Sequence, residues 1–198
     1  MQIISVSGQK GVGKDTIIDL LLGYCEKDFP GIVKRAIPIT DRPLREKEVE
    51  GRDIHTVSKE EFTTLRNDSK IIFPKDTPEC RNGILPAELE KSPIVVLNIL
   101  DEYVIKLRGL VEETKGKTYN VFLFTESNVA KSRIVGREAP LFEGMLEHTF
   151  ELSPGMSVEQ AREKFNLVVE NKEGQKEQTA QEVYKGVKPF IEQYWKNS

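Results

Sequence analysis

Residues 2–16 read QIISVSGQKGVGKDT, and this stretch decides the fold. The run of mostly apolar residues at its start predicts a buried strand, the glycines predict a tight turn, and the apolar residues that follow have the spacing of a helix. Gly8 and Gly13 stand at the separation of a Walker A motif, with Lys14 directly after them. A strand, a glycine-rich turn and a helix in this order form a phosphate-binding loop. We therefore predict that this loop binds the phosphates of a nucleotide.

The residue after Lys14 departs from the motif. A serine or threonine is usual there, because its hydroxyl binds Mg²⁺, but this chain has Asp15 and then Thr16. A carboxylate is also a hard oxygen ligand for Mg²⁺, although it adds negative charge beside the phosphates. We predict ATP and Mg²⁺ as cofactors, with Asp15 or Thr16 near the metal. The predicted cofactor-binding residues in this loop are Gly8, Gly11, Val12, Gly13, Lys14, Asp15 and Thr16.

The composition indicates one ordinary globular domain. The 198 residues carry a net charge of −3, with 38% hydrophobic and 31% charged residues. This acidity disfavours a general nucleic-acid or anionic-membrane surface, and no apolar run reaches transmembrane length. Cys25 and Cys80 lie far apart without the spacing of metal ligands. Reduced thiols and the lack of a signal-peptide pattern predict a cytoplasmic protein. The sequence does not determine the oligomeric state.

Strand and helix patterns alternate along the rest of the chain. Continuous apolar runs at 94–99 and 120–124, and a shorter one at 165–169, predict buried parallel strands, with another strand at 32–39. Helical patterns lie between them, which is typical of an α/β fold with a mainly parallel sheet. Three pairs of residues have the spacing of helix N-caps: Ser58 with Glu61, Ser157 with Gln160, and Thr179 with Glu182.

Residues 40–62 read TDRPLREKEVEGRDIHTVSKEEF. The spacing of the threonine, the two arginines, the glutamate and the Gly-x-Asp in this segment resembles the monophosphate-binding segment of guanylate kinases. Later landmarks agree in order, namely the strand at 95–99, the arginine pair within 133–137, and the last strand ending at Asn171. The resemblance covers nearly the whole chain; it is strongest over 1–62 and weak between 63 and 92.

This resemblance implies a P-loop kinase fold. The expected architecture has three layers, αβα, around a parallel sheet, with an inserted acceptor-binding segment and a lid. The whole chain, 1–198, would be one domain. Its discontinuous core would comprise 1–33, 92–125 and 151–198, with the acceptor segment at 34–91 and the lid at 126–150.

The resemblance also implies roles for individual residues. Bidentate guanidinium groups suit an acceptor phosphate, because they neutralise and orient it at once. Lys14 and the lid arginines Arg133 and Arg137 would be catalytic, stabilising the transferred phosphoryl group without a covalent nucleophile. The acceptor site would contain Arg42, Arg45, Glu48, Asp53, Asn98 and Asp101, and Asn171 would lie beside adenine. In the alternative interpretation the two arginine pairs are ordinary surface charges.

Several residues differ from those that bind the acceptor nucleotide in the family. Ile54 replaces a tyrosine that contacts phosphate, Pro38 replaces a serine that helps to seat the nucleotide, and the stretch 71–84 lacks the Tyr-Gly-Ser/Thr turn that reads guanine. The third strand ends without Asp-x-Asp, and no third lid arginine is evident between 138 and 148. A site built to hydrogen-bond one base discriminates strongly, so the loss of those groups predicts an acceptor other than GMP. Asp76, Glu79 and Arg81 could contact an acceptor base, or could be loop charges.

We therefore predict ATP-dependent phosphoryl transfer to a nucleoside monophosphate, such as a deoxy or modified nucleotide. Ribose bisphosphate is an alternative acceptor, and so is a nucleotide within a polymer, held by a basic patch of Lys70, Lys75 and Arg81. The alternative from another class is a binding module without catalysis, against which the retained Lys14 argues.

Overall fold

The computed structural model describes residues 1–46, 48–77, 80–138 and 156–196, and of residues 135–138 the backbone only. Its centre is a five-stranded sheet in which every neighbouring pair is parallel. In spatial order the strands are β2 (Val33–Arg35), β7 (Ile94–Asn98), β1 (Gln2–Gly8), β8 (Lys117–Phe124) and β9 (Leu167–Glu170). The strand that leads into the glycine-rich loop is therefore the middle one.

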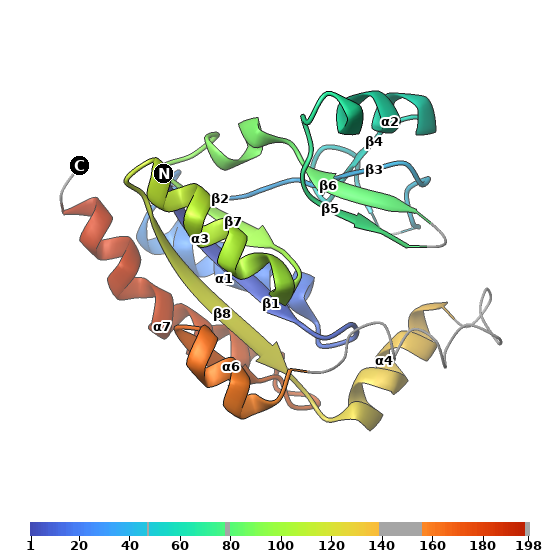
Figure 1. Ribbon diagram of the computed structural model, residues 1–198. Helices are drawn as coiled ribbons and strands as arrows, with labels where there is room; N and C mark the ends of the chain where they lie inside the picture. The colour runs from blue at the N-terminus through green and yellow to red at the C-terminus, as the bar shows by residue number, and fades with distance from the viewer. Residues whose placement is uncertain (47, 78–79, 139–155, 197–198) are drawn as a thin grey trace.

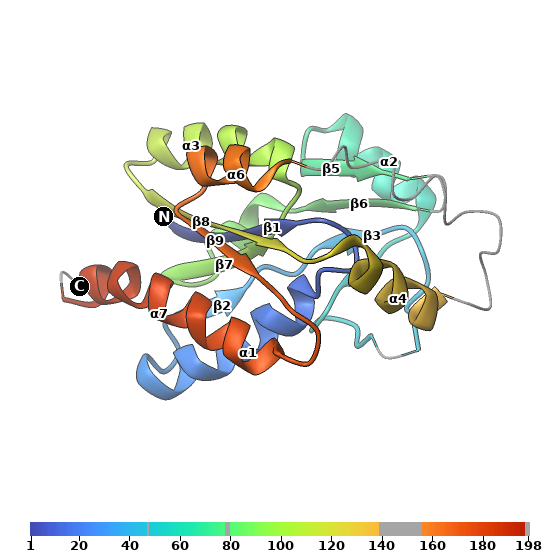
Figure 2. The ribbon, with the colours of Figure 1, turned by 90° about the horizontal axis from the view of Figure 1, so that it is seen from below.

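Helices cover both faces of this sheet. Figure 2 shows α1 (Lys14–Asp28) and α7 (Lys176–Trp195) below the sheet, and α3 (Val104–Glu113) and α6 (Val158–Lys164) above it. This arrangement confirms the predicted three-layer αβα fold with a parallel sheet. Within the described ranges, none of the helices combines the length and the apolar character needed to cross a membrane.

The side chains of β1 show why its sequence is apolar on both faces. Ile4 and Val6 point into the core formed with α1 and α7, whereas Ile3 points into the core formed with α3 and α6. Successive residues of a strand face opposite sides of the sheet, so a strand covered on both sides must be apolar throughout. Ser5 is also buried and forms a hydrogen bond with the side-chain amide of Asn120 of β8 at 2.7 Å, which satisfies a polar group at the centre of the sheet.

A second, smaller sheet is inserted after β2. Its spatial order is β4 (His55–Thr56), β3 (Ile39–Thr40), β6 (Arg81–Ile84) and β5 (Ile72–Asp76), and α2 (Lys59–Asn67) accompanies it. Ile39, Phe62 and Ile71 form its own small core. Two short 3₁₀ turns, η1 (Pro86–Leu89) and η2 (Asp101–Tyr103), flank β7 in the chain. Figure 1 shows this unit and α4 (Ser127–Glu138) on two sides of the carboxyl-terminal edge of the central sheet.

Two predicted elements differ from the structure. The strand expected at 32–39 is two strands in two sheets, because the chain leaves the central sheet after Arg35 and β3 begins after Pro38. The last helix begins at Lys176 rather than after a cap at Thr179, whose hydroxyl instead bonds Asn171 Oδ1 at 3.1 Å from within the helix. The predicted N-caps Ser58 and Ser157 are confirmed, each accepting from the backbone amide three residues later.

Candidate active site

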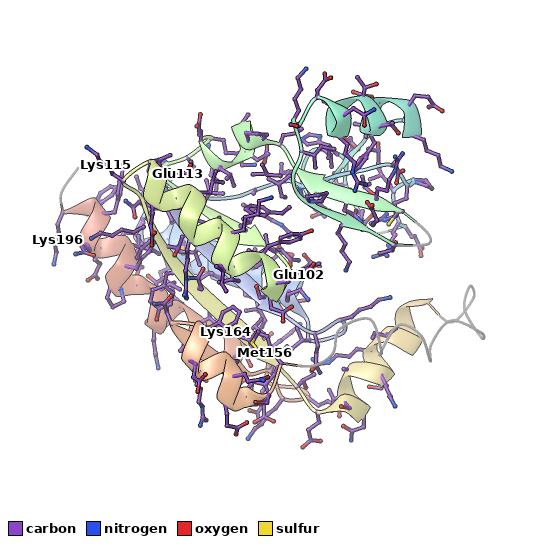
Figure 3. All side chains as sticks on the ribbon, viewed as in Figure 1. Glu102, Glu113, Lys115, Met156, Lys164 and Lys196 are labelled. Carbon is purple, nitrogen blue, oxygen red and sulfur yellow. The ribbon has the colours of Figure 1, made fainter. Side chains whose placement is uncertain are left out.

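The candidate site lies where the parallel strands end. The glycine-rich loop follows β1, and the carboxyl ends of β7, β8 and β9 surround it. In Figure 3, Glu102 lies at the end of α3 that is nearer the carboxyl edge of the sheet, whereas Glu113 and Lys115 lie at the opposite end. Ligands of open parallel sheets bind at the carboxyl edge of the strands, so the fold itself directs a ligand to this loop.

The loop has a backbone suited to an anion. Gly13 is the N-cap of α1 and adopts φ 89°, a left-handed conformation that favours glycine. The unpaired amides of the first turn of α1 and the partial positive charge of the helix end therefore face the loop. Gly8 is needed for a different reason: a Cβ atom on it would lie 2.1 Å from the carbonyl oxygen of Leu123 in β8.

Lys14 folds back over this loop. Its ammonium group donates to the carbonyl oxygens of Gly8 at 2.7 Å and Gln9 at 3.1 Å. Burial lowers the pKa of Lys14 to about 8, an effect that Asp15 and Asp101 partly offset and that Lys75 reinforces. Lys75 belongs to β5 of the inserted sheet. The inserted sheet thus brings a charge close enough to influence the lysine of the glycine-rich loop.

The unusual Asp15 has two partners from other strands. Its Oδ1 accepts from Arg35 Nη2 at 2.5 Å and from Asn98 Nδ2 at 3.1 Å, and Arg35 also pairs with Asp19 at 3.0 Å. Thr16 is exposed one position further along α1. Within the described ranges, no three His, Cys, Asp or Glu side chains gather into a complete metal site. One carboxylate fits Mg²⁺ all the same, since this ion takes one or two protein carboxylates together with phosphate oxygens and water.

The two predicted acceptor arginines are held by one glutamate. Arg42 forms a bidentate pair with Glu48, with both N···O distances 2.7 Å, and the Arg45 backbone amide donates to Glu48 at 2.9 Å. The hydrogen bonds that Arg42 donates to Glu48 raise the pKa of Arg42. Burial alone would raise the pKa of Glu48, but its bonds with Arg42 and Arg45 more than offset this and lower it. The structure therefore brings together three of the predicted acceptor residues.

Asp53 accepts hydrogen bonds from residues of its own loop. It accepts from the Val49 backbone amide at 2.9 Å and pairs with Arg52 at 2.7 Å, and the bonds from Arg52 lower its pKa. Both contacts lie within four residues of Asp53 in the chain. In the structure Asp53 therefore stabilises the turn at 49–53, which follows Glu48 in the chain.

The lid arginine Arg133 reaches the phosphate loop from α4. It donates to the carbonyl oxygens of Val12 and Lys172, both at 3.3 Å, and to that of Asn171 at 3.4 Å. Ala130 and Ile134 of the same helix are buried. The side chain of Arg137 and the predicted lid beyond residue 138 lie outside the described residues.

Asn171 lies beneath the loop. It is 2% exposed, and its amide donates to the Val12 carbonyl at 2.6 Å while it accepts from Thr179. Its polar atoms thus support the loop instead of facing a nucleotide base. A hollow of ≈ 500 Å³ opens beside it, lined by Thr125, Glu126, Asn128, Val129, Glu170, Lys172 and Glu173.

In the region that would read the acceptor base, the side chains are mostly apolar or already paired with neighbouring charges. Phe73 is 4% exposed, adopts φ 51° and packs against Tyr103, with the ring centroids 5.5 Å apart and the ring planes tilted by 47°. Ile54 is buried in the same segment. Asp76 pairs with Arg66 at 2.6 Å, Arg81 pairs with Asp41 at 2.6 Å, and Glu79 lies outside the described residues. The two described candidates are thus tied to neighbouring loop charges.

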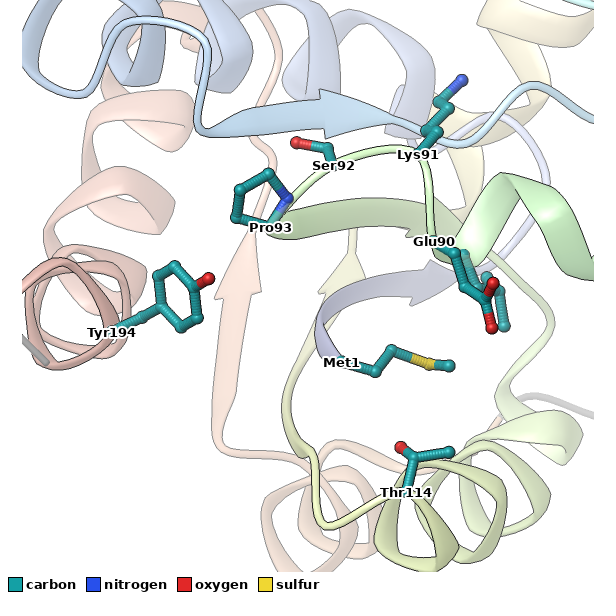
Figure 4. A pocket seen from close by; sticks show the side chains of 8 residues that line it. Met1, Glu90, Lys91, Ser92, Pro93, Thr114 and Tyr194 are labelled. Atoms are coloured by element: carbon teal, nitrogen blue, oxygen red, sulfur yellow. The ribbon is translucent and has the colours of Figure 1, made fainter. Parts of the chain in front are cut away.

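A cavity of ≈ 510 Å³ lies at the other end of the strands. Figure 4 shows Met1, Pro93, Thr114 and Tyr194 around it, with Glu90, Lys91 and Ser92 at its border. It opens at the amino-terminal edge of the central sheet, away from the phosphate loop. We therefore place the candidate active site at the carboxyl edge.

Arg35 is the residue at this site that the sequence interpretation missed. It lies two positions after Val33 on β2, and alternation places both side chains on the same face of the strand. The Arg35 side chain is 13% exposed and Val33 is buried, whereas Lys34 between them is exposed. A charged residue at an inward position of a predicted strand was the available signal, because such a charge needs a partner.

Comparison with known proteins agrees with this geometry. The family model for guanylate kinase matches residues 1–74. The chain is 39% identical over 64 residues to a guanylate kinase of Chlamydia pneumoniae, covering 32% of this chain and 29% of that protein. It is 35% identical over 101 residues to one of Mycoplasma mobile, covering 51% of this chain and 48% of that protein. The matched stretches thus span less than half of either relative.

The same likeness extends over the fold. The crystal structure of guanylate kinase from Anaplasma phagocytophilum superposes with a TM-score of 0.66 at 20% identity, covering 96% of this chain and 85% of that one. The guanylate kinase-like P-loop fold predicted from the sequence is therefore confirmed.

Proposed function

We propose that this chain, with its guanylate kinase-like P-loop fold, transfers the γ-phosphoryl group of ATP to a nucleoside monophosphate other than GMP. The observation that carries the proposal is the surroundings of Lys14. Its ammonium group lies on the phosphate loop, and its pKa responds to Asp101 after β7 and to Lys75 of the inserted sheet. A lysine in this position can contact a donor triphosphate while it faces the acceptor segment.

Different residues would bind the donor and the acceptor phosphates. The loop amides and Lys14 would hold the donor phosphates, and Arg42 and Arg45 would hold the acceptor phosphate. Two phosphate groups repel each other, so positive charge between them favours both binding and the in-line arrangement for transfer. The Arg42–Glu48 pair keeps the acceptor arginine in place before the ligand arrives. Arg133, and by the family resemblance Arg137, would add positive charge from the lid helix.

Magnesium and a cytoplasmic location are part of the proposal. The carboxylate of Asp15 and the exposed hydroxyl of Thr16 are the oxygen atoms of α1 that would face the ion. Bound there, Mg²⁺ would neutralise phosphate charge and orient the β- and γ-phosphates. The two free cysteines, one of them buried, are those of a chain kept under reducing conditions.

The acceptor argument rests on the wall of the base-reading region. A guanine site needs buried polar groups placed to meet the base. Here Phe73 is a buried apolar side chain, and Arg81 and Asp76 are already ion-paired. Hydrogen-bonding sites discriminate strongly, and apolar walls discriminate by shape. An acceptor nucleotide with a smaller or modified base, or with a deoxyribose, suits such a wall better than GMP.

The test is ADP release from ATP with Mg²⁺ across a panel of acceptors. The panel contains the common ribo- and deoxynucleoside monophosphates, modified pyrimidine monophosphates, ribose bisphosphate and a short oligonucleotide. Lys14→Ala is the variant expected to lose activity. Lys27→Ala is the matched control, because Lys27 lies in the last turn of α1, at the end of the helix opposite to Lys14.

The outcomes separate the possibilities. Turnover of one monophosphate, lost in Lys14→Ala and kept in Lys27→Ala, supports the kinase. If GMP is turned over fastest, the proposed acceptor is wrong. If only the oligonucleotide or ribose bisphosphate is phosphorylated, the acceptor class is wrong, and if ATP binds without any turnover the catalytic proposal fails.

A further inference from the structure

Asp15 is fixed at a single oxygen atom. In the described part of the chain its side chain makes two hydrogen bonds, from Arg35 at 2.5 Å and from Asn98 at 3.1 Å, and both end on Oδ1. Oδ2 therefore keeps its lone pairs for another ligand. The two donors come from the last residues of the neighbouring strands β2 and β7, whereas Asp15 lies in the first turn of α1. The contact thus joins the sheet edge to the start of the phosphate-binding helix.

Arg35 has more acceptors than an ordinary ion pair would give it. Its Nη1 binds Asp19, one helical turn after Asp15, at 3.0 Å, so one guanidinium bridges two carboxylates of α1. The Arg35 side chain is 13% exposed, whereas those of Asp15 and Asp19 are 52% and 63% exposed. Within the described residues, Nε of Arg35 is buried without a hydrogen-bond partner. A nearly buried guanidinium with an unsatisfied nitrogen is costly for stability, which favours a role in function.

The charge at position 15 explains what that role would be. A hydroxyl at the residue after the loop lysine is neutral, but Asp15 adds a full negative charge where a triphosphate must approach. Like charges a few ångströms apart repel strongly at a partly buried site. A guanidinium bonded to the same carboxylate cancels that charge and fixes the direction of the free oxygen.

We propose that Arg35 is a positioning residue for Asp15, holding its carboxylate through Oδ1 and cancelling its charge so that a triphosphate can bind beside it. This inference rests on the proposed function, because it requires the loop to bind a triphosphate. Asn98 assists from β7 as a neutral donor. Arg35 acts through Asp15 and is assigned no contact with the reacting atoms.

The competing explanation is a purely structural one. Arg35 could simply tie β2 to α1, and its loss would then reduce stability alone. The two explanations differ in what removal of Asp15 does. If Arg35 cancels the charge of Asp15, the damage from losing Arg35 should be repaired when Asp15 is also lost. If Arg35 is a structural tie, losing both partners should repair nothing in ligand binding.

The experiment is a double-mutant cycle on ATP affinity. ATP binding is measured by titration calorimetry for the full chain, with Mg²⁺ and with the ion chelated, in the wild type, Arg35→Met, Asp15→Ser and the double variant. Melting temperatures are recorded in parallel. Arg66→Met is the matched control, because Arg66 also pairs with an aspartate but lies on α2 of the inserted unit.

We expect Arg35→Met to weaken ATP binding about tenfold without Mg²⁺, and less with Mg²⁺, because the cation then neutralises Asp15. The double variant should regain wild-type affinity, and Arg66→Met should not change it. Where Arg35→Met does not fold, Arg35→Lys supplies the comparison, with a smaller loss that Asp15→Ser again repairs.

Two results would overturn the inference. One is a lower melting temperature of the Arg35 variants at unchanged ATP affinity. The other is a loss of affinity that persists in the double variant. Absence of ATP binding by the wild type would be the failure of the proposed function itself, and it is recognised before any variant is compared.

Discussion

Binding of ATP should make the protein take up protons at alkaline pH, because of Lys14. Burial holds the pKa of Lys14 at about 8 in the ligand-free protein, below its ordinary value of 10.5. Phosphate groups beside the ammonium favour its charged form and raise that pKa again. A lysine that is partly neutral before binding and fully charged afterwards must gain a proton from the solvent.

The size of the effect follows from the titration curve. With a pKa of about 8, roughly one tenth of the molecules have a neutral Lys14 at pH 7, about half at pH 8 and about nine tenths at pH 9. Proton uptake per bound ATP should rise through the same values if binding restores the ordinary pKa. ATP affinity should fall as pH rises, by about fivefold between pH 8 and pH 9, since the neutral form must first be protonated.

Titration calorimetry measures this uptake directly. At each pH, the apparent binding enthalpy is determined in buffers of different ionisation enthalpy, and the slope of their relation is the number of protons gained. Lys14→Met should bind ATP more weakly and show no uptake, whereas Lys27→Met should behave as the wild type. Equal uptake in wild type and Lys14→Met, or none in the wild type at pH 8 to 9, would refute the reasoning.

Three further substitutions test the loop, its support and the acceptor segment. Gly8→Ala should reduce the free energy of unfolding by about 3 kcal/mol and abolish ATP binding, because the new Cβ would lie 2.1 Å from the Leu123 carbonyl oxygen. Denaturant unfolding measures the first effect and an ATP titration the second. A variant as stable as the wild type would contradict the prediction. Asn171→Leu should cost about 2 kcal/mol, since the buried Val12 carbonyl loses the closer of its two donors, at 2.6 Å, and the Thr179 hydroxyl loses an acceptor. An unchanged melting temperature would show that these bonds contribute little. Glu48→Gln should raise KM for the acceptor about tenfold while ATP affinity stays the same, because Arg42 loses its charged partner. Steady-state kinetics measure both constants. A change confined to the ATP constants would count against the role assigned to Glu48.

The central fold could be predicted because its signals are local. The apolar runs that became β1, β7 and β8 are strands buried on both faces, and such strands have continuous apolar sequences. The loop before α1 could be predicted for the same reason, since glycine spacing and the following lysine are read within nine residues. The split of 32–39 into two strands could not, because it depends on which sheet each half joins, and that is decided by contacts distant in the chain.

Most residues of the candidate site could be predicted from the sequence, but the contacts between them could not. Glu48 was expected near the acceptor ligand, yet its bidentate pairing with Arg42 is a property of the folded turn. Asn171 was expected beside the nucleotide, and the structure buries it under the loop, where spacing alone could not place it. Arg35 is separated from Asp15 by 20 residues, and only the sheet order brings them together.

The separation of elements would allow such a chain to retain phosphate binding and still differ in its acceptor, as we propose. The phosphate loop belongs to the central sheet, with a large core on each face, and tolerates little change. The base-reading region belongs to the inserted sheet, whose own core is Ile39, Phe62 and Ile71. Phe73 lies on β5 of that unit but packs in the core that β1 and β7 share with α3, so it lies at the boundary between the two sheets. Base preference could change by substitution in the insert, while Lys14 keeps its place on the phosphate loop of the central sheet.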